Sequence, residues 1–188
     1  MNRPTWKAFA WALIACITTP SALAESKIVT GTATTSGAAA KLNLKIVIPE
    51  FIALKVGSGA ILTNNTAVDE ITLAVPEADA SNDTTIASSP VAVQLVSNVG
   101  SVSFSSSGDA LTSDTETIAL SRISVNSSNS ALPHPGFGAT ATPLAPSAGT
   151  KVINASTNWI FNYHHQGSTA PVGAGTFTTQ ITYTVAKP

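Results

Sequence analysis

Residues 175–185 read GTFTTQITYTV, and this stretch decides the fold. Its large apolar side chains, Phe177, Ile181, Tyr183 and Val185, fall on odd positions, and threonine or glutamine lies between them. Alternation with a period of two is typical of a β-strand that buries one face. Each of the four side chains contributes about 1.5 to 3 kcal/mol if it is fully buried. We therefore predict a core strand with these four residues on its buried face.

The same period recurs along most of the chain. The alternating stretches are 41–56, 71–75, 91–104, 118–125 and 159–163. No stretch after residue 24 has an apolar stripe with the 3.6-residue period of a helix. About eight or nine strands without intervening helices predict an all-β fold, an antiparallel β-sandwich of immunoglobulin-like kind.

Turn residues predict how some of these strands connect. Residues 91–104 alternate on either side of Asn98 and Gly100, which predicts a β-hairpin. The apolar parity switches within residues 118–125, and one extra residue near Arg122 would restore it. We therefore predict a β-bulge near Arg122.

The first 24 residues have the parts of a secretory signal peptide. Arg3 and Lys7 supply positive charge, residues 8–17 form an apolar run, and residues 22–24 read ALA, a cleavage site for signal peptidase. The apolar run is about half the length that a membrane-spanning helix needs. We predict an exported chain that begins at Glu25, resides in the periplasm, at the cell surface or outside the cell, and has no transmembrane segment.

A lipoprotein signal is the alternative. Residues 13–16 read LIAC and resemble a lipobox, in which the cysteine is lipidated, and Cys16 is the only cysteine. Cleavage after Ala24 removes Cys16, and the mature chain then depends on no disulfide.

Size and charge limit the functions available. Removal of the first 24 of 188 residues leaves 164, enough for one domain with its own core. It also removes two positive charges, so that 7 basic residues oppose 10 acidic ones and the formal charge changes from −1 to about −3. Such a chain has no basic footprint for nucleic acid, so we predict none as a partner.

The mature chain is expected to consist of two parts. Residues 25–40 are poor in large apolar side chains and predict an N-terminal arm or first strand, and residues 41–188 predict the β-sandwich domain. Within the arm, Val29, Gly31 and Ala33 alternate and are small enough for a strand donated to a neighbour.

No stretch carries a recognised catalytic motif. His164 and His165 are adjacent, and neighbours on a strand point to opposite faces, so we predict a solvated loop end and no shared metal. The acidic residues Glu77, Asp79 and Asp83 lack the glycine and terminal glutamate of a calcium loop. We therefore predict no enzyme, no cofactor and no metal site.

Residues 126–156 are rich in proline and glycine and predict one long loop. Loops of this length are uncommon and often functional. His134 lies in it without a visible partner, so we predict that it faces solvent. Trp159, Phe161 and Tyr163 then alternate on a strand, which favours burial in the core over a carbohydrate platform.

The C-terminal part resembles a known group of proteins. The sequences NWIFNY at 158–163 and PVGAGTFTTQITYTV at 171–185 resemble the closing strands of bacterial exported immunoglobulin-like domains. These include fimbrial subunits of chaperone–usher systems and spore-coat-U-like secreted proteins. The chain departs from the commonest fimbrial pattern because it lacks paired cysteines and because Tyr183 is not the penultimate residue.

The resemblance implies a structural subunit of a surface filament or coat that assembles by β-strand addition. The implied partners are further copies, other surface subunits and a periplasmic chaperone. The alternative is a monomeric periplasmic or secreted binding module that meets its ligand through the loop 126–156.

Overall fold

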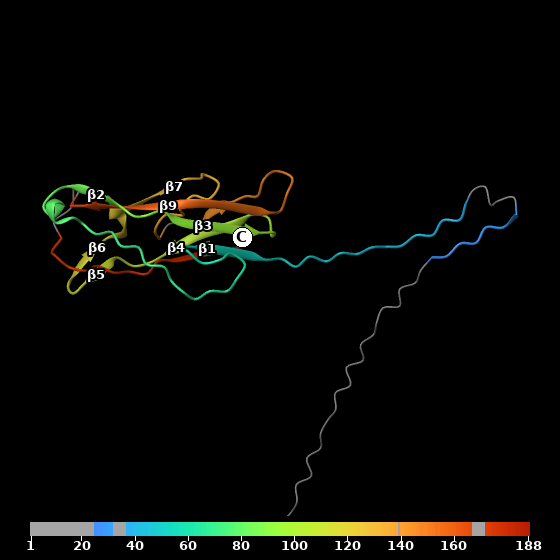
Figure 1. Ribbon diagram of the computed structural model, residues 1–188, viewed down its shortest axis with the longest axis horizontal. Coiled ribbons are helices and arrows are strands. Elements are labelled where there is room, and N and C mark those ends of the chain that lie inside the picture. Colours follow the sequence, from blue (N-terminus) through green and yellow to red (C-terminus); the bar gives the residue numbers. More distant parts are fainter. Residues whose placement is uncertain (1–24, 32–36, 139, 167–171) are drawn as a thin grey trace, which may run out of the picture. The chain divides into compact units, whose positions relative to one another are not determined.

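A computed structural model of the chain describes residues 25–31, 37–138, 140–166 and 172–188 (Figure 1). It divides into two units, of which the first ends at Ile48 and the second spans Pro49–Pro188. The predicted signal peptide, residues 1–24, and Ala33 lie outside the described residues. Within the described ranges, no helix has the length and apolar character needed to cross a membrane.

In the first unit, residues 37–48 run as an extended trace that belongs to no strand (Figure 1). The prediction that residues 41–48 form part of a core strand is therefore wrong. Proline has no N–H to donate, so a ladder cannot continue unbroken through Pro49. The regular strand begins only at Ile52.

The second unit is all-β and antiparallel, as predicted, with ten strands and two short 3-10 helices in its described part. In chain order the elements are β1 Ile52–Val56, η2 Glu77–Asp79, β2 Thr84–Ala87, β3 Val91–Ser97, β4 Val102–Ser107, β5 Leu111–Ser113, β6 Glu116–Ile118, η3 Leu120–Arg122, β7 Ile123–Ser127, β8 Thr142–Leu144, β9 Ile153–His165 and β10 Thr182–Ala186.

The strands form three sheets. The largest contains β1, β3, β9, β2 and β7, the second has the order β10-β4-β8, and the third pairs β5 with β6. In the largest sheet, Trp159 of β9 pairs with Val91 of β3 and with Ser127 of β7. Since one residue can pair once on each side, β3 and β7 lie on opposite sides of β9 (Figure 1).

The two larger sheets contribute side chains to one core. Its buried members are Val93, Leu95, Val102, Phe104, Leu132, Leu144, Ile153, Trp159 and Phe161. At its centre the rings of Trp159 and Phe104 stack with their centroids 5.9 Å apart, and both side chains are fully buried. Trp159, Phe161 and Tyr163 are all buried, which confirms the predicted aromatic core strand.

The predicted hairpin at 91–104 is wrong. β3 pairs with β1 and β9, whereas β4 pairs with β10 and β8, so the turn at 98–101 joins two different sheets. Val93 and Leu95 reach the core from one sheet, and Phe104 reaches it from the other. Alternation reports which face of a strand is buried, and it is the same whether two strands pair or face each other across a core.

Two further local predictions are corrected. In place of a bulge near Arg122, helix η3 separates β6 from β7, which belong to different sheets, so their parities are independent. Residues 71–75 form no strand, although Leu73 packs against the core.

The predicted long loop at 126–156 is interrupted by regular structure and packs partly into the core. It contains β8 and the fully buried Leu132, and β9 begins already at Ile153. The inward positions that follow on β9 are Ala155 and Thr157, which are small or polar. A buried face made of such residues leaves no apolar alternation to recognise.

The last strand, β10, is shorter than the predicted stretch. Tyr183 and Val185 lie within it and pack half-buried against the core, whereas Phe177 and Ile181 precede it. All four odd-numbered side chains are half-buried, and the residues between them are exposed. The odd-numbered side chains therefore share the inward face, as the sequence pattern indicated. Only the C-terminal part of the stretch 175–185 is hydrogen-bonded to β4 as a strand.

Candidate functional site

The most unusual feature of the molecule is a run of apolar side chains in water. Leu42, Leu44, Ile46, Val47 and Ile48 are 75% to 84% exposed. Single exposed apolar residues are ordinary, but a contiguous run of them marks an interaction site or an aggregation hazard. We call residues 42–48 the apolar segment.

The second feature lies in Pro49–Pro188, where two sheet edges meet. β1 is the outermost strand of one sheet and β10 of another, and the two lie next to each other without forming a ladder. Their inward side chains are Ile52, Leu54, Val56, Tyr183 and Val185, which we call the β1–β10 flank.

All five side chains of the β1–β10 flank pack against the core but are only half-buried. On the strands next to them, Val93, Leu95 and Phe104 are shielded almost completely. In the described part of the chain, β10 forms backbone hydrogen bonds only with β4. An edge strand with a free row of N–H and C=O groups is a template for pairing with another strand.

The residues that enter β1 are held by the turn between β3 and β4. The N–H of Phe51 donates to Oδ1 of Asn98, with N and O 2.8 Å apart, and Nδ2 of Asn98 donates to the carbonyl of Pro49, also at 2.8 Å. Nearby, Nζ of Lys187 lies 2.9 Å from Oε1 of Glu50. Residues 49–51, which we call the root, are therefore tied both to the β3–β4 turn and to the residue that follows β10.

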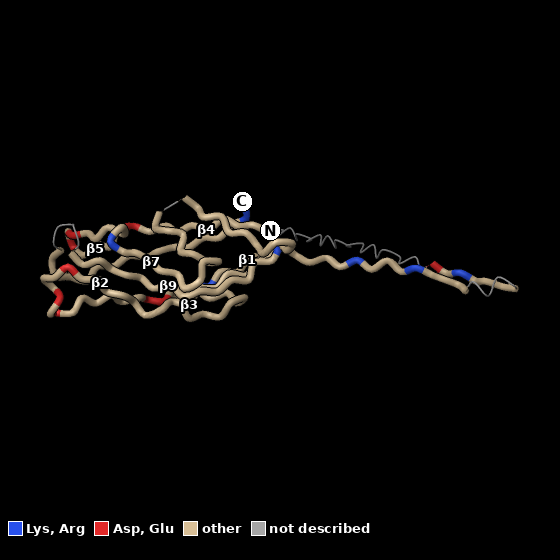
Figure 2. Tube along the Cα trace, turned by 90° about the horizontal axis from the view of Figure 1, so that it is seen from above, with Lys and Arg blue, Asp and Glu red and all other residues tan. Residues whose placement is uncertain are grey.

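The two units carry opposite formal charges (Figure 2). Residues 25–48 contain three lysines and one glutamate, a formal charge of +2, whereas residues 49–188 contain four basic and nine acidic residues, a formal charge of −5. Opposite net charges steer association in water and are screened by salt.

A second cluster surrounds His134, which the sequence predicts to be solvated. The structure contradicts this, because the ring lies among four aromatic rings. The distances between ring centroids are 4.8 Å to Phe137, 4.8 Å to Trp159, 5.5 Å to Tyr183 and 5.9 Å to Phe161. Burial lowers the pKa of His134 to about 4, so the imidazole is neutral at pH 7.

The hydrogen bonds of His134 define its tautomer. The N–H of Gly136 donates to Nδ1 at 3.0 Å, so Nδ1 carries no proton. The neutral ring then has its proton on Nε2, which donates to the hydroxyl oxygen of Tyr183 at 2.9 Å. Burial also raises the pKa of Tyr183, so its phenol stays protonated. The hydrogen bond between His134 and Tyr183 therefore connects the loop to β10, and both side chains are uncharged at neutral pH.

The remaining histidines lie on β9, which continues through His165 and does not end before them. As alternation requires, His164 is exposed and His165 is buried. Nε2 of His165 lies 3.0 Å from the carbonyl of Ala80, and the ring of His164 contacts the hydroxyls of Thr85 and Ser124. Among the described residues, no group of three or more acidic, histidine or cysteine side chains could hold a metal ion.

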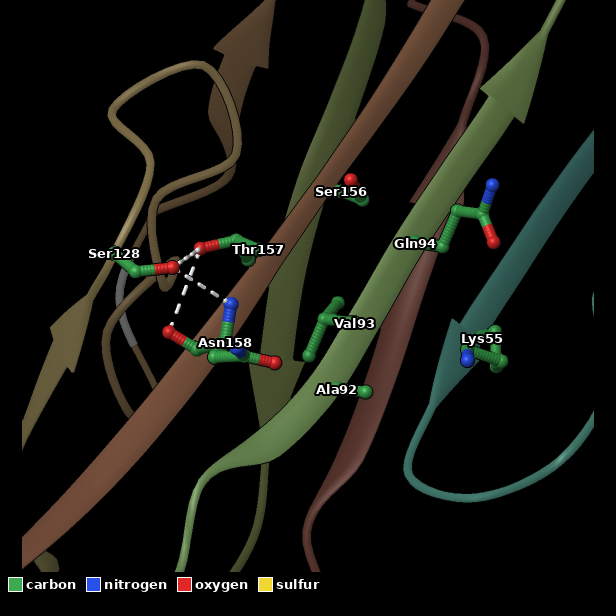
Figure 3. Close-up of a pocket in the computed structure, with 8 residues that line it drawn as sticks. All are labelled: Lys55, Ala92, Val93, Gln94, Ser128, Ser156, Thr157 and Asn158. Atoms are coloured by element: carbon green, nitrogen blue, oxygen red, sulfur yellow. Dashed lines mark hydrogen bonds between the residues drawn. The ribbon is translucent and has the colours of Figure 1, made fainter.

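Two shallow hollows border the structured part of residues 126–156. One, of about 280 Å³, lies on the outer face of β1, β3 and β9 and is lined by Lys55, Gln94, Ser156 and their neighbours (Figure 3). The other, of about 400 Å³, lies beside β7 and is lined in part by His134 and Phe137. Both are open depressions.

Of the predicted strand donors, Val29 is half-buried and Gly31 exposed, and Ala33 lies outside the described residues. Their role stays a prediction. Sequence reasoning missed Asn98 as an anchor, although an Asn in a turn signals a side chain that can bond to backbone.

Comparisons of the chain with protein-family models, with curated proteins and with solved structures found no match.

Proposed function

We propose that the protein is an exported, non-catalytic structural subunit of a surface filament or coat. Copies assemble by β-strand addition, in which a segment of one copy pairs with a sheet edge of the next. The domain in this proposal is an immunoglobulin-like β-sandwich whose β1–β10 flank lacks one strand. A periplasmic chaperone that covers the apolar segment or this flank before assembly is a further partner in the proposal.

One observation carries the proposal. Residues 42–48 have the period-two apolar pattern of a core strand, yet their side chains are exposed. A strand of this kind stays soluble only if another surface covers it. We therefore assign the donor role to the apolar segment, since Val29 and Gly31 have far less apolar surface to bury.

The size of the apolar segment suits this role. Burial of Leu42, Leu44, Ile46 and Ile48 stabilises a complex by about 1.5 to 3 kcal/mol for each side chain. The sum is comparable with the entropic cost of association, commonly put at about 4 to 15 kcal/mol. Backbone hydrogen bonds to a free strand edge then add the net free energy of binding, so that pairing with a strand is more favourable than apolar contact alone.

The acceptor is the β1–β10 flank of a second copy. It offers half-buried Ile52, Leu54 and Val185 on strands that have free edges. The positive charge of residues 25–48 and the negative charge of residues 49–188 favour pairing between copies. Such a contact is head-to-tail and does not close, so it produces fibres.

A monomeric binding module is the second candidate, and one observation favours it. Both hollows are lined in part by residues of the stretch 126–156. A protein of this kind would remain monomeric at high concentration, because its ligand and not a second copy would occupy its surface.

Sedimentation velocity of residues 25–188 at increasing concentration tests the proposal. The wild-type chain is expected to form large, concentration-dependent species. Leu44→Asp is expected to stay monomeric with an unchanged melting temperature. Asn43→Asp is the matched control, because it adds the same charge between two apolar positions and is expected to assemble. A wild-type monomer at all concentrations would refute the proposal and favour the binding module.

A further inference from the structure

The Asn98 amide holds the root in the way that a neighbouring strand would. Its Oδ1 accepts from the N–H of Phe51, and its Nδ2 donates to the carbonyl of Pro49, two residues earlier. A backbone strand pairs with alternate residues in the same manner. The Asn98 N–H also donates to the carbonyl of Phe51, with N and O 3.3 Å apart. The root is thus fixed as an extended continuation of β1.

The position of the root matters because it lies where β10 ends. Lys187 directly follows β10 and pairs with Glu50 through an ion pair whose two side chains are both largely exposed. Such a pair adds little stability by itself, but it locates the root at the C-terminal end of β10. The apolar segment joins the root directly, at Pro49.

The apolar segment can be covered either by its own domain or by a second copy, and the position of the root affects these two possibilities differently. β10 runs toward Glu50 and ends beside it, so the rest of β10 extends back from Glu50 on the side of β1. To line β10 of its own domain with all of residues 42–48, the chain would therefore have to reverse direction within residues 49–51. A reversal needs a tight turn with non-extended backbone angles. That turn would break the hydrogen bonds from Asn98 to Pro49 and Phe51, whereas pairing with a second copy leaves them intact.

We infer that Asn98 is a positioning residue that favours donation of the apolar segment to a second copy over closure onto its own domain. The inference rests on the proposed function, but the orientation of the arm can be measured without assembly. Without the Asn98 side chain, the self-closed fraction is expected to rise about tenfold, because two hydrogen bonds that oppose the reversal are gone.

Pulsed electron–electron double resonance on the mature chain at low concentration tests the inference. Spin labels at Asn43→Cys and Thr184→Cys report the distance between the arm and β10 within one molecule. The wild-type background is expected to give only long, broad distances. Asn98→Ala is expected to give a short-distance population about tenfold larger, and the self-association of the unlabelled variant is expected to fall accordingly. Asn154→Ala is the control, because Asn154 is exposed on β9.

Each outcome has one meaning. Equal distance distributions in wild type and a folded Asn98→Ala overturn the inference, and so does a short distance in the wild type. If Asn98→Ala does not fold, Asn98→Asp replaces it, since it keeps the acceptor for Phe51 and loses the donor to Pro49. An open wild-type arm without any self-association refutes the proposed function and leaves the role of Asn98 in opposing closure intact.

Discussion

Nε2 of His134 lies 2.9 Å from the hydroxyl oxygen of Tyr183, and this contact joins the loop after β7 to the last strand. The loop is fixed at two further points, where Trp159 Nε1 donates to the carbonyl of Leu132 and Ser106 donates to the carbonyl of Gly136. The loop is therefore packed as part of the core. The stability of the domain depends on the imidazole of His134 being neutral.

Acid is expected to destabilise the domain through His134. The pKa of His134 is about 4 in the folded state and near 6.5 in the unfolded state, so the unfolded chain binds a proton first as the pH falls. The His134 contribution to stability is full above pH 6.5 and is lost progressively toward pH 4.

Urea unfolding at several pH values measures this effect. The free energy of unfolding should fall between pH 6.5 and 4 in the wild type, with a smaller slope in His134→Gln. Equal slopes in the two proteins would show that His134 titrates normally in the fold.

Leu132→Ala is expected to destabilise the domain by about 2 to 5 kcal/mol, because it leaves a cavity beside Trp159. Leu132 is fully buried although it lies in a stretch of loop-like composition. Val152→Ala is the control, since Val152 is 52% exposed and should change stability by less than ~0.5 kcal/mol. Chemical denaturation measures the free energy of unfolding of both variants. A similar decrease in both would mean that the loop does not pack as described.

Two acid substitutions on neighbouring residues of β10 test its orientation. Val185 faces the core and pairs with Phe104, whereas Thr184 is exposed. Val185→Asp places an unpaired charge against the core and should cost several-fold more stability than Thr184→Asp, whose cost should stay below ~1 kcal/mol. Thermal melting of both variants gives the comparison, and equal melting temperatures would place the register of β10 in error.

The sequence predicted which faces are buried better than it predicted which strands are neighbours. Val93, Leu95 and Phe104 are buried as their alternation indicated, yet β3 and β4 lie in different sheets. The pairing is set by contacts distant in sequence, such as those of β9 with β2 and β7. The N-terminal half of β9 was hidden because its inward residues are small or polar.

The candidate site was predicted only in part. The alternation at Leu42, Leu44 and Ile46 indicated a strand, but a strand that its own domain leaves uncovered has the same pattern as a core strand. The burial of His134 was missed because its partner, Tyr183, is 49 residues away in the sequence and no local sequence pattern predicts the contact.

Two deletions separate the possible donors. Removal of residues 25–38 eliminates Val29, Gly31 and Ala33 and retains the apolar segment, so assembly should persist. Removal of residues 25–48 should yield a folded monomer with a melting temperature close to that of the wild-type monomer. Size-exclusion chromatography with light scattering measures both outcomes. Loss of assembly in the shorter deletion would return the donor role to Val29, Gly31 and Ala33.

Hydrogen–deuterium exchange of residues 42–48 tests the central claim of strand addition most directly. The mature chain, residues 25–188, is compared at a concentration where it assembles and at one where it is monomeric. Strand addition predicts that the backbone amides of this segment exchange rapidly in the monomer and become protected in the assembly, together with those on the free edge of β10. Rapid exchange of residues 42–48 in assembled protein would contradict the account.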